Sequence, residues 1–149
     1  MTDLVTTARQ IATDAHRGQV DKAGAPYIGH PARVAGHAAA AGGDERVVAA
    51  AWLHDVVEDT DVTPDDLRAA GIPDDVVAAV VALSKVPGQS VEDYFAAVNR
   101  DPIAIAVKSA DLADNTAPDR LALLDEGTRQ RLVAKYARAR SLLGVPLGP

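Results

Sequence analysis

The chain has 149 residues, of which 48% are hydrophobic and 24% are charged, a balance typical of a globular protein in water. This length predicts one domain over residues 1–149, with a frayed tail at residues 144–149 that is rich in glycine and proline. The net charge of −6 argues against binding to nucleic acid or to an anionic membrane, because both need a basic surface. The absence of cysteine excludes disulfides, thiolate metal sites and cysteine nucleophiles.

The first residues lack the charged and apolar regions of a secretory signal, and no apolar run approaches the length that spans a bilayer. We therefore expect a cytoplasmic protein. Aromatic residues make up only 3% of the chain, whereas alanine is abundant, and small side chains favour closely packed helices over a β-sandwich. The alanine-rich faces suit either a core or a contact between copies, so an oligomer stays open.

Two predicted helices flank a loop in the N-terminal part of the chain. Apolar residues at helical spacing predict the first helix over residues 4–15, and Gly18 ends it. A loop rich in glycine and proline follows over residues 18–29. Pro31 then stands in the first turn of a second helix, where proline is tolerated best, and this helix runs to Gly42.

Capping residues predict the starts of the next helices. Asp44 can cap a helix whose apolar stripe continues through Trp52, and residues 63–66 and 90–93 both resemble capping boxes. The apolar run at residues 76–81 could pass for a buried strand, but the preceding proline and acids and the lack of a partner strand favour a helix.

The C-terminal third of the chain is also predicted to be helical. Asp101 and Pro102 start a helix that continues through Ala110, and a last helix spans about residues 128–143. The sequence therefore predicts a compact all-α fold built from several helices.

The segment from Trp52 to Thr60 gathers one histidine and three acids after an apolar run. On a continuous helix, the four polar side chains would share one face; they are His54, Asp55, Glu58 and Asp59. Acids at the C-terminal end of a helix interact unfavourably with the helix dipole, which destabilises the helix by about 0.3–1 kcal/mol for each acid. A cation bound there would make the interaction favourable. Solvated surface acids are the usual reading of such a run, but the adjacent histidine and the apolar residues before it favour a metal site.

Two further places in the chain supply metal-ligand chemistry. Asp111 ends a second apolar helix, with Asn115 four residues later, and His30 directly precedes the helix-opening proline. Each alone would be read as a helix end or a loop residue. Together with the segment above they provide two imidazoles and two carboxylates, a donor set that suits Mn²⁺, Fe²⁺, Zn²⁺ or Co²⁺ more than Ca²⁺. Such an ion acidifies water into a nucleophile, and Glu58 and Asp59 would remain for proton transfer.

Four blocks of this sequence, in the same order, resemble the HD-domain metal-dependent phosphohydrolases. Within that superfamily the resemblance is closest to the hydrolase domain of RelA/SpoT proteins and their small single-domain alarmone hydrolase relatives. The similarity runs over residues 4–143. The four blocks are Ala15–Gln19, Gly24–Pro31, Leu53–Thr60, and Val107–Asp111 with Asn115.

The resemblance implies an all-helical HD fold and an enzyme that removes the 3′-pyrophosphate from guanosine 3′,5′-bis(diphosphate). It implies one divalent ion, usually Mn²⁺, held by His30, His54, Asp55 and Asp111. Glu58 and Asp59 would orient or deprotonate the attacking water, and Asn115 would hold the ribose or the phosphate side. Tyr27 would form part of the pocket wall. The basic residues that remain as phosphate contacts are Arg17, Lys22, Lys108, Arg131 and Lys135.

The sequence departs from the family pattern at two positions. Asp21 stands where relatives usually carry an arginine that packs on the purine, and Asp114 stands where they commonly carry a basic residue. A carboxylate at position 21 would repel an anionic nucleotide, so two alternatives stay open. One is an HD phosphohydrolase for another nucleotide or small phosphorylated metabolite. The other is a nucleotide-sensing HD module without catalysis, which the retained Glu58 and Asp59 disfavour.

Overall fold

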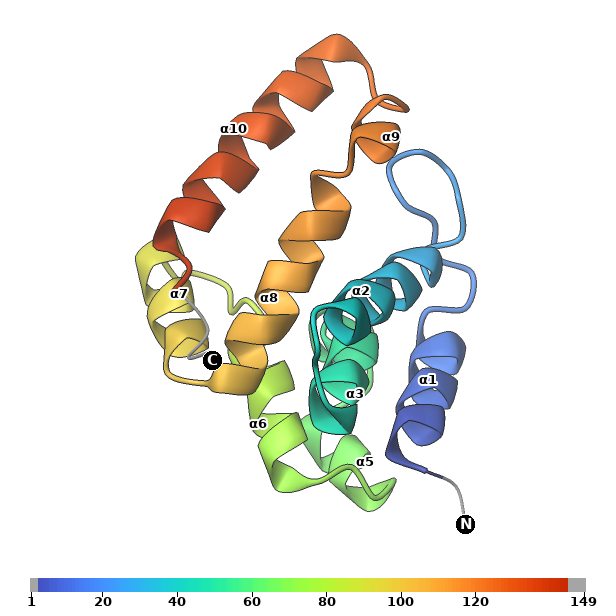
Figure 1. Cartoon of the computed structure of the whole chain (residues 1–149). Helices are drawn as coiled ribbons and strands as arrows, with labels where there is room; N and C mark the ends of the chain where they lie inside the picture. Colours follow the sequence, from blue (N-terminus) through green and yellow to red (C-terminus); the bar gives the residue numbers. More distant parts are fainter. Residues whose placement is uncertain (1–2, 145–149) are drawn as a thin grey trace.

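The computed structural model describes residues 3–144, and this part of the chain is helical apart from its loops and one isolated bridge between Val20 and Pro26. The predicted all-α fold is confirmed (Figure 1). The helices are α1 (Leu4–Ala15), α2 (Gly29–Ala40), α3 (Glu45–Leu53), α4 (Val56–Asp59), α5 (Pro64–Ala69), α6 (Asp74–Leu83), α7 (Val91–Asn99), α8 (Pro102–Asn115), α9 (Pro118–Leu121) and α10 (Glu126–Leu142).

The predicted caps begin their helices as expected. The Asp44 side chain accepts the amides of the first turn of α3, and the Asp101 side chain does the same for α8. Thr63 and Asp66 form a complete capping box at the start of α5, and Ser90 accepts the amide of Asp93 in α7. Each such cap typically stabilises a helix by about 0.5–2 kcal/mol.

Two details of the chain differ from the sequence-based expectation. The helix expected to continue from His54 to Asp59 is interrupted, because α3 ends at Leu53 and α4 begins only at Val56. The last helix begins two residues earlier than predicted, since Asp125 rather than a later residue caps it. Of the predicted frayed tail, residues 145–149 lie outside the described part, and the Gly144 amide donates to Asn99.

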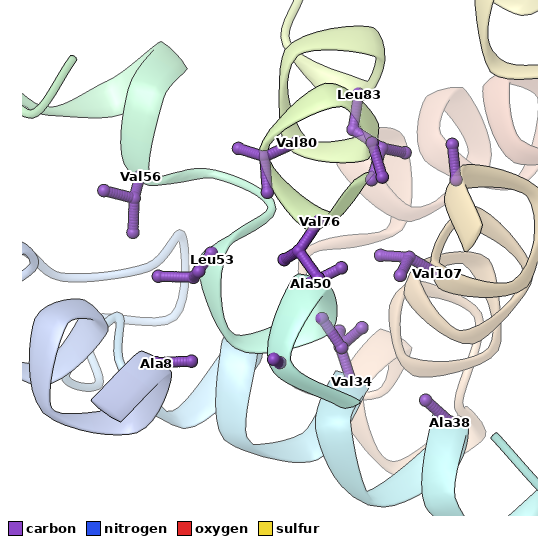
Figure 2. Close-up of a cluster of buried hydrophobic side chains, with 14 of the residues drawn as sticks. Ala8, Val34, Ala38, Ala50, Leu53, Val56, Val76, Val80, Leu83 and Val107 are labelled. Atoms are coloured by element: carbon purple, nitrogen blue, oxygen red, sulfur yellow. The ribbon is translucent and has the colours of Figure 1, made fainter. Parts of the chain in front are cut away.

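The core is built largely from small aliphatic side chains around α3. Figure 2 shows side chains from α1, α2, α3, α6 and α8 directed toward one another. Three consecutive alanines of α3, Ala49, Ala50 and Ala51, have no exposed surface, so α1, α2, α6 and α8 approach this helix on several sides. The abundance of alanine therefore serves close helix packing in the core.

Enlarging one of these alanines should destabilise the fold. We expect Ala50→Leu to lower the free energy of unfolding by about 1–3 kcal/mol, because a close-packed site has no room for three more carbons. Ala78→Leu on the exposed side of α6 is the matched control and should change it by less than about 0.5 kcal/mol. Urea unfolding of the two variants measures both values, and equal effects would contradict this account of the core.

Helix α10 stands apart from the other helices along most of its length (Figure 1). Its C-terminal end packs near α7, where Arg138 pairs with Glu92 at 2.6 Å, and Ala139 and Leu142 rest on the core. Its middle part, including Leu132, Lys135 and Tyr136, also lines a cavity, which is described below. No helix within residues 3–144 is long and apolar enough to cross a bilayer.

Candidate metal centre

The ends of three helices carry the predicted metal ligands. His30 lies in the first turn of α2, Asp111 lies in the last turns of α8, and His54 follows α3 directly. The break between α3 and α4 is flanked by Leu53 and Val56, which are fully buried and hold both sides of it in the core. His54 and Asp55 lie within this break, so the break determines the position of both residues.

Three of the four predicted ligands converge on one point. His30, His54 and Asp111 each offer one ligand atom, and these atoms lie within 4.8 Å of one another. Nε2 of His30 is 2.9 Å from Oδ1 of Asp111, and Nε2 of His54 is 3.6 Å from the same oxygen. Asp55 lies beside them, with Oδ2 at 3.1 Å from Nε2 of His54 and 3.9 Å from Nε2 of His30.

Both imidazoles are held so that Nε2 faces this point. Nδ1 of His54 donates to the carbonyl oxygen of Ala51 at 2.6 Å, and Nδ1 of His30 donates to Asp114 at 2.7 Å. A proton on Nδ1 leaves the lone pair of Nε2 free for an ion. Nε2 of His54 is buried and has no hydrogen-bond partner, which is costly for a polar atom unless a ligand satisfies it. The donor set and this buried nitrogen fit a divalent cation.

The electrostatics of the four residues also suit a cation. Burial raises the pKa of Asp111, but the two imidazoles and the charge of Lys108 outweigh it and hold the pKa well below its usual value. Burial likewise opposes ionisation of Asp55, yet His54 and Tyr27 hold its pKa at about 2. Burial lowers the pKa of both imidazoles, but the surrounding carboxylates raise it above the usual value, so binding of a cation would release protons.

Three residues assigned to the substrate by resemblance line the cavity and also contact the candidate metal ligands. Nζ of Lys108 donates to Asp111 at 3.0 Å, and the Asn115 amide donates to the other oxygen of Asp111 at 3.1 Å. The Tyr27 hydroxyl donates to Asp55. These contacts orient both carboxylates, as expected of residues around a metal site.

The two acids predicted to handle protons are in different surroundings. Glu58 accepts the backbone amide of Lys85 at 2.6 Å, so one of its oxygens holds the segment after α6. Asp59 keeps both carboxylate oxygens for other partners, and partial burial beside Asp55 and Glu58 raises its pKa to about 6. Asp59 is therefore the better placed of the two to exchange a proton near neutral pH.

A cavity of about 980 Å³ opens over the ligands and is closed on the far side by α10. Lys22, Lys108 and Lys135 line it, as does Lys85, which sequence analysis missed. Two other predicted phosphate contacts are not among the lining residues: Arg17 is 77% exposed and pairs with Asp14, and Arg131 donates to Thr128 on α10.

Comparison with known proteins identifies the family. Residues 8–110 match the family model described as HD domain. The chain is 38% identical over 122 residues to a probable guanosine-3′,5′-bis(diphosphate) 3′-pyrophosphohydrolase of Synechocystis, an alignment covering 75% of this chain and 16% of the relative. It is 37% identical over 116 residues to the pyrophosphohydrolase of Haemophilus influenzae, covering 70% and 17% of the two chains. A GTP pyrophosphokinase of Streptomyces coelicolor is 35% identical over 119 residues, covering 74% and 14%.

A solved structure supports the fold. It is described as a metazoan orthologue of SpoT that hydrolyses ppGpp, and it superposes with a TM-score of 0.78 over 98% of this chain and 88% of that one, at 24% identity. The match extends the similarity in fold to nearly the whole chain, whereas the aligned part spans only about a sixth of the length of the curated relatives. With the ligand geometry, these matches show that the chain belongs to the HD domain family.

Proposed function

We propose that this protein is a divalent-metal-dependent phosphohydrolase whose substrate is guanosine 3′,5′-bis(diphosphate). The observation that carries the proposal is the convergence of two Nε2 atoms and a carboxylate at the base of a cavity lined by four lysines. The names of the relatives supply the substrate, since two of them are pyrophosphohydrolases of this nucleotide.

The proposed metal is Mn²⁺, held by His30, His54, Asp55 and Asp111. When bound, such an ion supplies a Lewis acid that lowers the pKa of water and offsets charge on a phosphate. Fe²⁺, Co²⁺ and Zn²⁺ fit the same nitrogen and oxygen donors.

The hydrolysis step also needs a proton acceptor and residues that hold the metal ligands in position. Water attacks the phosphorus bonded to the 3′ oxygen, a new phosphorus–oxygen bond forms, and the bond to the 3′ oxygen breaks. Asp59 accepts the proton of the water, while the 3′ oxygen takes up a proton as it leaves with the 5′-nucleotide. Lys108 and Asn115 keep Asp111 in place during this exchange.

The lysines of the cavity support an anionic substrate. Burial lowers the pKa of Lys135, and the charges of Lys85, Lys22 and Lys108 lower it further. The like charges of Lys22, Lys85 and Lys135 repel one another, whereas Lys108 is paired with Asp111, and an anion between the three lysines would offset their repulsion. A polyphosphate with one end at the metal ligands and the other toward α10 has the required charge.

Asp21 favours a second candidate, namely another phosphorylated nucleotide. Its Oδ1 accepts the amides of Ala23 and Ala25 at 2.9 and 3.0 Å, and its Oδ2 lies 3.7 Å from Arg120. The carboxylate thus shapes the loop and offers no cation to a base at this position. Replacing it with arginine would also remove these loop contacts, so substrate comparison is the cleaner test.

A substrate panel tests the proposal. With Mn²⁺, the purified protein is expected to release pyrophosphate from guanosine 3′,5′-bis(diphosphate), and EDTA is expected to stop the reaction. The adenine counterpart, nucleoside 5′-triphosphates and 3′-phosphorylated nucleotides are assayed in parallel by ³¹P NMR. Turnover confined to another member of the panel would favour the second candidate. Binding of these nucleotides without turnover of any of them would favour a sensing module.

A further inference from the structure

Asp114 is a buried carboxylate behind the metal centre and is not one of the proposed ligands. It lies in the last turn of α8, and only 1% of its surface is exposed. Its Oδ2 accepts from Nδ1 of His30 at 2.7 Å and from Arg120, and its Oδ1 accepts from Nε of Arg33 at 2.9 Å. These partners compensate the burial of the Asp114 carboxylate, because an unpaired buried charge would strongly destabilise the protein.

The contact with His30 decides how that ligand faces the metal centre. With one proton on Nδ1 directed to Asp114, the ring turns Nε2 toward Asp111, and loss of the Nε2 proton when a cation binds would free the lone pair of this nitrogen for the ion. His54 is oriented in the same way, but by the neutral carbonyl of Ala51. A carboxylate partner makes a stronger hydrogen bond and raises the basicity of the ligating nitrogen.

Two guanidinium groups hold the carboxylate in place. Arg33 lies one turn after His30 on α2, so Asp114 bridges two positions of the same helix. A Cβ at Gly29 would stand 2.9 Å from Nη1 of Arg33, so the glycine leaves room for this guanidinium. Arg120 comes from α9, and Nη1 lies 3.4 Å from Nδ1 of His30 because both groups face the same oxygen.

Arg120 also connects this arrangement to the rim of the cavity. Its Nη2 lies 3.7 Å from Oδ2 of Asp21 in the loop before α2, and Figure 1 shows that loop next to α9. The two carboxylates at which the sequence departs from its relatives thus share one arginine.

We propose that Asp114, clamped by Arg33 and Arg120, is a positioning residue that orients His30 for metal binding. This inference rests on the proposed function, because it assigns Asp114 a role toward the same metal. An arrangement that served stability alone would support folding but would leave the metal affinity of the folded protein unchanged.

The test is the Kd of the full chain for Mn²⁺, measured by electron paramagnetic resonance titration without substrate. Asp114→Asn keeps the size of the side chain but removes its charge and is expected to raise the Kd about 10–100-fold. Asp114→Glu keeps the charge but displaces the carboxylate, so its Kd should lie between those of the wild type and Asp114→Asn. The control is Asp75→Asn, which removes a carboxylate paired with Arg46 at the start of α6 and should leave the Kd unchanged.

Thermal unfolding of the metal-free variants separates affinity from stability. A lower Tm of Asp114→Asn with an unchanged Kd in both Asp114 variants would overturn the inference and leave Asp114 a purely structural role. If Asp114→Asn does not fold, Asp114→Glu decides the question by the same Kd criterion. Failure of the wild-type protein to bind Mn²⁺ would overturn the proposed metal centre as well, so the two failures are distinguishable.

Discussion

Replacing His54 with alanine is expected to abolish tight binding of Mn²⁺ and to lower the hydrolysis rate by about 10³-fold or more. Nε2 of His54 is buried without a hydrogen-bond partner and faces Asp55 and Asp111, so the truncation removes one of the converging ligand atoms. The fold should survive, because the truncation removes a polar ring next to a helix end that Leu53 and Val56 hold in the core.

The matched control is His37→Ala. His37 lies on α2 with 43% of its side chain exposed and does not line the cavity; its Nε2 stays 4.0 Å from Asp114. Elemental analysis after dialysis against Mn²⁺, with circular dichroism as a check of helicity, compares the two variants. Equal Mn²⁺ content in His54→Ala and the wild type would refute this ligand assignment.

Replacing Asp59 with asparagine is expected to lower kcat by about 10²–10⁴-fold, the range typical of losing a general base. The Kd for Mn²⁺ should remain close to that of the wild type, since Asp59 is outside the group of converging ligand atoms. Asp61→Asn is the control, because Asp61 is an exposed acid two residues later that does not line the cavity. If Asp59→Asn kept the wild-type kcat, Asp59 would not be the general base. If its kcat fell together with its affinity for Mn²⁺, the effect would be one of metal binding and would also contradict this role.

The pH dependence of the same reaction gives a second readout for Asp59. Partial burial and the nearby Asp55 and Glu58 raise its pKa to about 6. A general base works only when it is deprotonated, so kcat should fall as the pH is lowered through this region. A bound divalent cation favours the carboxylate, which places the midpoint at or below 6. This acidic limb should be absent from the residual activity of Asp59→Asn.

The helices were largely predictable because their starts are encoded locally. Asp44, Thr63, Ser90 and Asp101 each bond to amides two or three positions away, so the pattern is visible in a short window. The interruption at His54 was not predictable in this way. Neither glycine nor proline marks it, and it depends on burial of Leu53 and Val56 by other helices.

The sequence predicted which residues converge at the candidate site, but not the side chains that surround them. The types and order of His30, His54 and Asp111 were sufficient to propose a metal centre. The contact between His30 and Asp114 joins positions 84 residues apart, so a pattern within a short stretch of sequence cannot predict it. Lys85 gave no signal in the sequence either, because it becomes relevant only when the end of α6 reaches the cavity.

The most direct test of the metal centre is an anomalous-scattering map from crystals of the wild-type protein grown with Mn²⁺. We expect one peak per chain, about 2–2.5 Å from Nε2 of His30, Nε2 of His54 and the carboxylates of Asp55 and Asp111. Soaking with EDTA should remove it. A map with no peak among these four side chains, or with its peak elsewhere on the chain, would contradict the account.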